Sequence, residues 1–210
     1  MITSRLNFYN IKWKYRKFVT AVYYRRVMGA IGKGSTVCKP MHINHPECIY
    51  CGEHVYFRDF ARIEAVCEYD NQHFSPKIQV GDNTRFEQGL HLTCGDLVKI
   101  GRNCIIMSYV MITDLTHKYD DLNMNVLDQP LSAASVEIGD DCYIGSGARI
   151  MPGVHLGKHC VIEPNSVVVG GDYPDYSVIA GMPARYIKRY SYKSQKWEKT
   201  DAKGNFFNEV

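Results

Sequence analysis

The feature that most constrains this chain is a repeat of aliphatic or small residues every six positions. The repeat runs in phase through residues 31–61, 80–98 and 100–112, and its most regular block is Ile138, Ile144, Ile150, Leu156, Ile162 and Val168. An amphipathic helix repeats apolar residues every three or four positions and a strand every two, so a period of six fits neither element alone. The repeat indicates a solenoid in which each hexad is a short strand followed by a turn.

Glycine follows the aliphatic residue in several hexads, as in Ile31-Gly32 and Ile138-Gly139, and it permits the backbone conformations of sharp corners. Stacked coils would bury one column of aliphatic side chains and pair each backbone with the coils above and below. Cys104, Cys142 and Cys160 share one hexad position, so we interpret them as small core residues in adjacent coils rather than as ligands.

Breaks in the phase of the repeat indicate insertions into the solenoid. Ala61 and Val80 are nineteen residues apart, one more than three hexads, and Ile112 and Ile138 are twenty-six apart. The second break predicts a long loop at about residues 114–136, with the sequence Thr-His-Lys-Tyr-Asp-Asp at 116–121. Because inserted loops on a rigid scaffold commonly carry function, we expect the chemistry there.

Composition and charge bound the remaining possibilities. The chain has 210 residues, 45% of them hydrophobic, which favours one main domain. A net charge of +3 is too small to predict nucleic-acid binding, although residues 1–30 contain seven basic residues and no acidic one. No apolar run is long enough to span a bilayer and the N-terminus lacks the apolar core of a signal peptide, so we expect a cytoplasmic protein.

The eight cysteines are too sparse for a small secreted disulfide scaffold, which favours free thiols. Cys48 and Cys51 form a C-x-x-C pair flanked by His45 and His54, which is one possible zinc site. The six-residue repeat accounts for these positions without a metal, and we expect none.

Two stretches strengthen the argument from the repeat: Val136-Glu-Ile-Gly-Asp-Asp-Cys-Tyr-Ile-Gly-Ser146 and the segment from Ser166 to Arg185 that includes Ile-Ala-Gly-Met-Pro-Ala-Arg. With the hexads, they resemble the hexapeptide-repeat acyltransferases, in particular bacterial O-antigen and exopolysaccharide O-acetyltransferases, over about residues 31–190. The resemblance implies a mainly β fold, a left-handed parallel β-helix with three hexads per coil, whose crossovers break the usual right-handed rule. It also implies acetyl-CoA as co-substrate and a homotrimer with active sites between subunits.

Activating a hydroxyl needs a base that is available near neutral pH, and histidine suits that role. His117 lies where a regular coil meets the long loop, and the resemblance implies that it is the catalytic base. Asp114 and Asp120 lie three residues to either side, and a carboxylate bonded to one ring nitrogen would fix the tautomer. The sequence leaves open which aspartate does this.

The same resemblance gives candidates for the donor site. Tyr143 stands where relatives often have tryptophan beside the acetyl-CoA channel, and Ser146 stands where a donor would face the thioester oxygen. Gly145 and Asn165 complete this group, although Gly145 and Ser146 also fit an ordinary corner. Further candidates, for the CoA phosphates, are Arg185 and Lys188, which equally fit the solvated basic end of a helix.

Two departures from the family weaken this assignment. Many relatives have Thr-Lys where this chain has Val169-Gly170, which removes one common cationic contact to CoA. Pro164 stands where relatives offer a backbone N–H, and proline has none. For the acceptor, the candidates that can bind sugar hydroxyls are Gln88, His91 and Asp96, and each can equally be a solvated surface residue.

The ends of the chain are expected to differ from the solenoid. Within residues 1–30, Ile11, Tyr15, Phe18 and Val22 form one helical stripe, which predicts a basic, aromatic helix that caps the first coil or contacts anionic lipid. Residues 31–182 form the predicted β-helix domain, and residues 183–210 a helical or irregular extension.

The function predicted from the sequence is an O-acetyltransferase acting on a sugar of a bacterial surface polysaccharide or its precursor. N-acetylation of an amino sugar nucleotide, or acetylation of a small molecule, is the alternative, since one base and donor site serve both. A carbonic anhydrase on this fold would need three histidines around zinc, and none follows His117 until His155. An inert scaffold is the remaining class.

Overall fold

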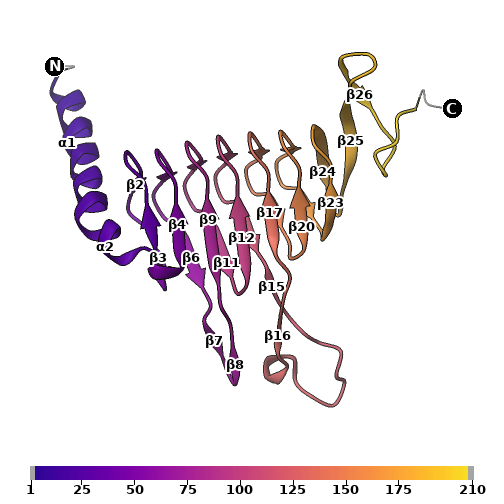
Figure 1. Cartoon of the computed structure of the whole chain (residues 1–210), viewed down its shortest axis with the longest axis horizontal. Coiled ribbons are helices and arrows are strands. Elements are labelled where there is room, and N and C mark those ends of the chain that lie inside the picture. The colour runs from indigo at the N-terminus through magenta and orange to yellow at the C-terminus, as the bar shows by residue number, and fades with distance from the viewer. Residues whose placement is uncertain (1–2, 208–210) are drawn as a thin grey trace.

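The computed structural model describes residues 3–207 and forms a solenoid of stacked coils with a helix at one end (Figure 1). Three mainly parallel sheets form its faces. The seven-stranded sheet contains β1 (Ala30–Ile31), β4 (Ile49–Cys51), β9 (Lys77–Val80), β12 (Leu97–Ile100), β17 (Val136–Ile138), β20 (Val154–Leu156) and β23 (Gly171–Tyr173). The six-stranded sheet contains β3 (His42–Asn44), β6 (Arg62–Ala65), β11 (His91–Cys94), β14 (Met111–Thr113), β19 (Arg149–Ile150) and β22 (Val167–Val168).

The third sheet has nine strands and extends to the C-terminal end of the solenoid. It contains β2 (Thr36–Val37), β5 (Tyr56–Phe57), β10 (Arg85–Phe86), β13 (Ile105–Ile106), β18 (Tyr143–Ile144), β21 (Val161–Ile162), β24 (Ser177–Gly181), β25 (Ala184–Ser191) and β26 (Lys196–Lys199). The predicted left-handed parallel β-helix is confirmed.

The core is the column of aliphatic residues that the hexads predict. Ile106, Ile144 and Ile162 are fully buried and aligned in successive parallel strands. Cys104, Cys142 and Cys160 are buried in the same coils, as expected of small core residues. Each coil therefore covers the apolar side chains and satisfies the backbone of its neighbours.

Two corners of the solenoid carry most of the site residues predicted from the sequence. Corner I joins the nine-stranded to the six-stranded sheet and includes Gly89, Tyr109, Gly147 and Asn165, all with positive φ. Corner II joins the six-stranded to the seven-stranded sheet and includes the segments 95–96, 151–153 and 169–170. At both corners the chain turns from one face to the next while keeping the coils in register.

Both large phase breaks are hairpins that project from corner II on the same side of the molecule (Figure 1). The first pairs β7 (Glu68–Tyr69) with β8 (Gln72–His73), and the second pairs β15 (Leu115–His117) with β16 (Leu131–Ala133). The loop beyond β15 contains a short 3-10 helix, η3 (Val126–Asp128).

The N-terminal helix runs through α1 (Thr3–Val19), a π-helical segment η1 (Thr20–Tyr24) and α2 (Arg25–Val27). It lies against the first two coils: the Thr20 hydroxyl accepts the Val37 N–H of the first coil at 2.9 Å, and Arg16 pairs with Asp59 of the second coil at 2.8 Å. The predicted apolar stripe lies elsewhere on the helix and is exposed: Ile11, Tyr15, Phe18 and Val22. No helix within residues 3–207 is long and apolar enough to span a membrane.

The expectation of a helical or irregular C-terminal extension is wrong for residues 184–199. Here β25 pairs antiparallel with both β24 and β26. Tyr190 and Trp197 are cross-strand neighbours with ring centroids 5.8 Å apart, so aromatic pairing favours the strands. The last three residues of the predicted extension lie outside the described part of the chain, as do the first two of the N-terminal segment.

Candidate active site

His117 is the last residue of β15 and its side chain is exposed at the side of the β15–β16 hairpin. Its backbone is paired with Leu131 across the hairpin. Its ring contacts the Tyr69 ring edge to face, with centroids 5.4 Å apart and an interplanar angle of 81°. The imidazole therefore lies on a hydrogen-bonded β-hairpin rather than on an irregular loop.

Asp114 is fully buried and does not orient His117 as predicted. Its carboxylate accepts the backbone N–H groups of Gly95 and Asp96, both at 2.8 Å, and contacts the Cys94 thiol. Burial raises the pKa of Asp114, while the backbone hydrogen bonds act in the opposite direction. Asp114 thus fastens the hairpin root to the coil below, because its two oxygens are used on that corner.

Asp120, the other candidate, is exposed in the loop after β15. Across residues 3–207, neither aspartate hydrogen-bonds to the His117 ring. The residue that does touch the ring, Tyr69, comes from the other hairpin and was not identified from the sequence. The nineteen-residue spacing was the only signal that anything projected there.

The candidate donor residues Tyr143, Gly145, Ser146 and Asn165 gather at corner I in two adjacent coils. The Ser146 carbonyl accepts the Asn165 N–H at 2.9 Å, and Tyr143 and Ser146 are half-buried. A Cβ at Gly145 would lie 2.5 Å from the Pro164 nitrogen, so the next coil requires glycine at this position. The group offers an aromatic wall, a hydroxyl and an amide on one exposed edge.

Arg185 and Lys188 lie on β25 rather than at the end of a helix. The turn before β25 adjoins the donor residues, because the Gly181 N–H donates to the Ser166 hydroxyl at 3.2 Å. Arg185 is exposed and donates to the Ala184 carbonyl, while Lys188 pairs with Val178 and Lys199 further along the strand. Arg185 is therefore the cation nearer to corner I along the chain.

The structure does not bring His117 and the donor residues together within one chain. His117 projects from corner II, whereas Tyr143 and Ser146 lie at corner I, with the six-stranded sheet between them. The extended chain from Gly147 to Pro152 crosses that sheet and spans about 16 Å at the usual rise per residue. That distance is too long for the predicted base and the predicted donor residues of one chain to act on the same acetyl group.

The candidate acceptor residues are spread along one coil below the hairpin. Gln88 is exposed at corner I, His91 is half-buried on β11, and Asp96 is exposed at corner II. Burial, followed by the charge of Arg62, lowers the pKa of His91 and favours the neutral ring. Of these three residues, only Asp96 lies at corner II, which also carries His117. The Asp96 N–H donates to the Asp114 carboxylate at the root of the His117 hairpin.

A histidine–carboxylate pair does occur, at His155, where the sequence did not predict it. Its Nδ1 lies 2.9 Å from Asp172 Oδ1, and the pair is exposed on the seven-stranded sheet. No cluster of three or more His, Cys, Asp or Glu side chains suited to a metal ion occurs among residues 3–207. Cys51 of the C-x-x-C pair is buried, which raises the pKa of its thiol to about 12.

Comparison with known proteins connects this architecture to a family of transferases. The sequence model of the family described as bacterial transferase hexapeptide (six repeats) matches residues 135–170. The putative lipopolysaccharide biosynthesis O-acetyl transferase WbbJ of Escherichia coli is 35% identical over 125 residues, which cover 56% of this chain and 63% of that protein. A probable acetyltransferase of Mycobacterium tuberculosis is 32% identical over 60% of this chain and 45% of its own length. This chain thus spans less than two thirds of these relatives.

Solved structures share the fold. The N-acyltransferase AntD from Bacillus cereus, in complex with dTDP and 3-hydroxybutyryl-CoA, superposes with a TM-score of 0.67 at 18% identity, covering 81% of this chain and 87% of AntD. A hexapeptide-repeat acetyltransferase from Vibrio cholerae, complexed with acetyl coenzyme A, gives a TM-score of 0.54 at 20% identity and 86% coverage of both chains.

The buried Asp114 carboxylate predicts a specific effect on stability. In Asp114→Asn one amide oxygen replaces two acceptor oxygens, so one of the two backbone N–H groups loses its partner. We expect the free energy of unfolding to fall by about 1–3 kcal/mol, the usual cost of an unsatisfied buried group. The exposed Asp120→Asn is the control and should unfold as wild type does. Equal urea midpoints for the two variants would contradict the role of Asp114.

Proposed function

We propose that this chain, in which residues 135–170 match the model of the bacterial transferase hexapeptide family, transfers an acetyl group from acetyl-CoA to a sugar hydroxyl of a bacterial surface polysaccharide or its precursor. One observation carries the proposal: an exposed histidine on a hairpin of a hexapeptide solenoid whose other edge holds the Tyr143–Ser146 group. The name of the relative WbbJ, putative lipopolysaccharide biosynthesis O-acetyl transferase, supports a sugar hydroxyl as acceptor.

In the proposed mechanism, His117 acts as general base. Its free ring nitrogen takes the proton of the sugar hydroxyl as the oxygen forms a bond to the thioester carbonyl carbon. Ser146 donates to the carbonyl oxygen, which carries negative charge in the tetrahedral intermediate. The C–S bond then breaks, and His117 returns the proton to the CoA sulfur. The acetyl ester and CoA are released, and no covalent enzyme intermediate is formed.

The residues at corner I fit acetyl-CoA. Tyr143 offers an apolar wall to the pantetheine arm, Ser146 and Asn165 offer polar groups to its amides, and Arg185 offers a cation to a phosphate. Lys188 is a second candidate cation on the same strand. Val169 and Gly170 supply no cation, and Pro164 supplies no backbone N–H, so the affinity for CoA rests on the remaining contacts.

A complete site requires a second copy of the chain. Corner II carries His117 and corner I carries the donor group, and one chain holds them apart by the width of a sheet. A cyclic oligomer places corner II of one subunit against corner I of the next, because such interfaces join two different surfaces of the same protein. We propose a homotrimer, the smallest ring that suits a three-sided prism.

A second candidate function is N-acylation of an amino sugar nucleotide. It is favoured by the similarity to AntD, an N-acyltransferase crystallised with dTDP and also with dTDP-4-amino-4,6-dideoxyglucose. The same base and donor group serve an amine, which needs deprotonation only after it has attacked. The choice of acceptor therefore decides between the two functions, not the choice of base.

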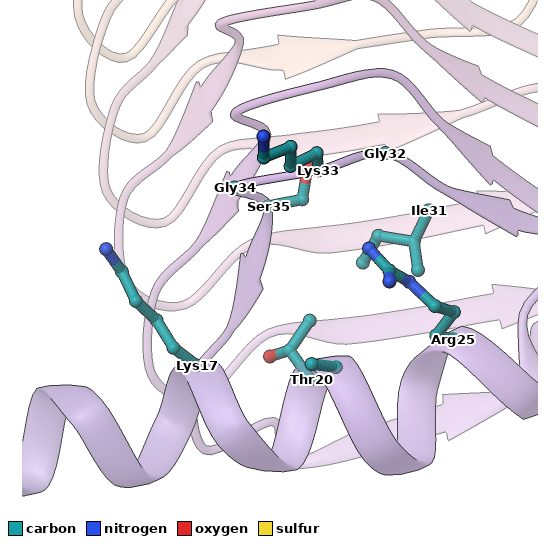
Figure 2. A pocket seen from close by; sticks show the side chains of 9 residues that line it. Lys17, Thr20, Arg25, Ile31, Gly32, Lys33, Gly34 and Ser35 are labelled. Atoms are coloured by element: carbon teal, nitrogen blue, oxygen red, sulfur yellow. The ribbon is translucent and has the colours of Figure 1, made fainter.

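We also propose that the protein works in the cytoplasm, in peripheral contact with the inner membrane surface. Ile11, Tyr15 and Phe18 are between 61% and 66% exposed on the N-terminal helix. Basic residues lie on the same helix, and a hollow of about 250 Å³ beside it is lined by Lys17, Arg25 and Lys33 (Figure 2). Exposed apolar residues with neighbouring cations suit an anionic lipid surface.

The base is tested by CoA release from acetyl-CoA with a panel of glycans, amino sugar nucleotides and small alcohols. We expect His117→Ala to lose at least about a hundredfold in rate, the usual scale for a general base. His155→Ala, which removes an exposed histidine paired with the Asp172 carboxylate, is the matched control and should retain activity. Loss of activity in His155→Ala with retention in His117→Ala would transfer the assignment to the other histidine.

Membrane contact is tested by sedimentation with vesicles of phosphatidylglycerol and of phosphatidylcholine. We expect binding to the anionic vesicles alone, and Ile11→Asp should weaken it about tenfold or more, because an inserted isoleucine contributes about 1.5–3 kcal/mol. Ile105→Asp alters an isoleucine that is exposed on the solenoid and should bind as wild type does. Equal binding of both variants would show that the helix does not mediate the contact.

A further inference from the structure

The β7–β8 hairpin has no role in the chemistry described so far, yet it is fastened to the hairpin that carries His117. The Gln72 side chain donates from Nε2 to the Leu131 carbonyl at 3.1 Å and accepts the Leu131 N–H through Oε1 at 2.6 Å. A side-chain amide thus pairs with the main chain of β16 as a neighbouring strand would. Leu131 is the residue directly opposite His117 in the β15–β16 register.

Tyr69 makes a second connection between the two hairpins. Its hydroxyl donates to the Leu127 carbonyl at 3.2 Å, and its ring packs edge to face on the His117 imidazole. Tyr69 is also the cross-strand partner of Gln72, so one short hairpin presents both side chains together. The backbone opposite His117 and the ring of His117 are therefore held by neighbouring residues of one element.

The loop beyond His117 is organised separately, by Gln129. This side chain is buried and joins the Asp121 backbone at both its N–H and its carbonyl, at 3.1 and 2.9 Å. The loop is thus closed on itself, and Gln72 and Tyr69 connect it to the solenoid. Asp114 holds the same hairpin at its root, through the Gly95 and Asp96 N–H groups.

We propose that Tyr69 and Gln72 are positioning residues for His117. A catalytic histidine is commonly oriented by a hydrogen bond to one ring nitrogen, and the described residues give His117 no such carboxylate partner. Here the Tyr69 ring, packed edge to face with the imidazole, limits its orientation, and Gln72 fixes the strand paired with β15. Holding a base in place before the acceptor arrives lowers the entropic cost of reaching the reactive geometry. The inference rests on the proposed role of His117 as the base.

The first test is kinetic. We expect Tyr69→Leu and Gln72→Ala to lower kcat by about tenfold to a hundredfold, the scale of a small misplacement of a catalytic group, with an unchanged KM for acetyl-CoA. Tyr69→Phe keeps the ring and should lose much less. Asn71→Ala, in the turn of the same hairpin, is the control and should match wild type.

The effect must also depend on His117. In a His117→Ala background, Tyr69→Leu and Gln72→Ala should cause no further loss, because residues that act through His117 have nothing left to position. A loss of the same size with and without His117 would overturn the proposal, and so would single variants with wild-type kcat.

A spectroscopic test separates the failure of this inference from the failure of the proposed function. In histidine-labelled protein, the NMR signals of the His117 ring are assigned by their loss in His117→Ala. They should shift in Tyr69→Leu, which removes the neighbouring ring, and stay in place in Asn71→Ala. If the signals shift but the protein transfers no acetyl group, the contact between Tyr69 and His117 is supported and the proposed function is refuted. Unshifted signals would refute the positioning itself, whatever the activity.

Discussion

The rest of the structure depends on the stacking of one coil upon the next. Most hexads contribute a strand of two to four residues, which would not form in isolation. Such a strand becomes stable only when neighbouring coils cover its aliphatic side chain and pair with its backbone. Ile106, Ile144 and Ile162 show the pattern, since each is fully buried and aligned with the next. The corners follow from the same constraint, and a Cβ at Gly145 would collide with the coil above it.

A regular solenoid has few positions where side chains can form a site. In this chain the insertions that interrupt the repeat provide such positions. Both insertions leave the prism at corner II, and each is tied back by polar side chains rather than by a core. Asp114 fastens the root of the second hairpin through two backbone N–H groups, and Gln72 fastens its far strand through Leu131. The result is an exposed imidazole on a supported hairpin, placed the width of one sheet from the Tyr143–Ser146 group.

The sequence predicted the solenoid well because burial repeats strictly along it. The hexads, the cysteine column and the projecting loop at residues 114–136 are all local or periodic signals. Contacts between the two insertions are neither local nor periodic, because Gln72 and Leu131 are 59 residues apart and neither belongs to the repeat. The role of Asp114 was missed because proximity in sequence to His117 favoured a partner in the loop, whereas burial placed its carboxylate on the coil below. At the C-terminus, the aromatic residues and the Gly-Met-Pro turn were signals for strands, and the expectation of a helical or irregular extension did not use them.

The central claim is that the base and the donor group of one active site come from two copies of the chain. It is tested most directly by mixing two inactive variants, His117→Ala and the double variant Tyr143→Ala with Ser146→Ala, in co-assembled oligomers. The account predicts recovery of about a quarter of wild-type activity, because in a random ring one interface in four joins an intact His117 to an intact donor group. Mixed oligomers that stay as inactive as either variant alone would contradict it.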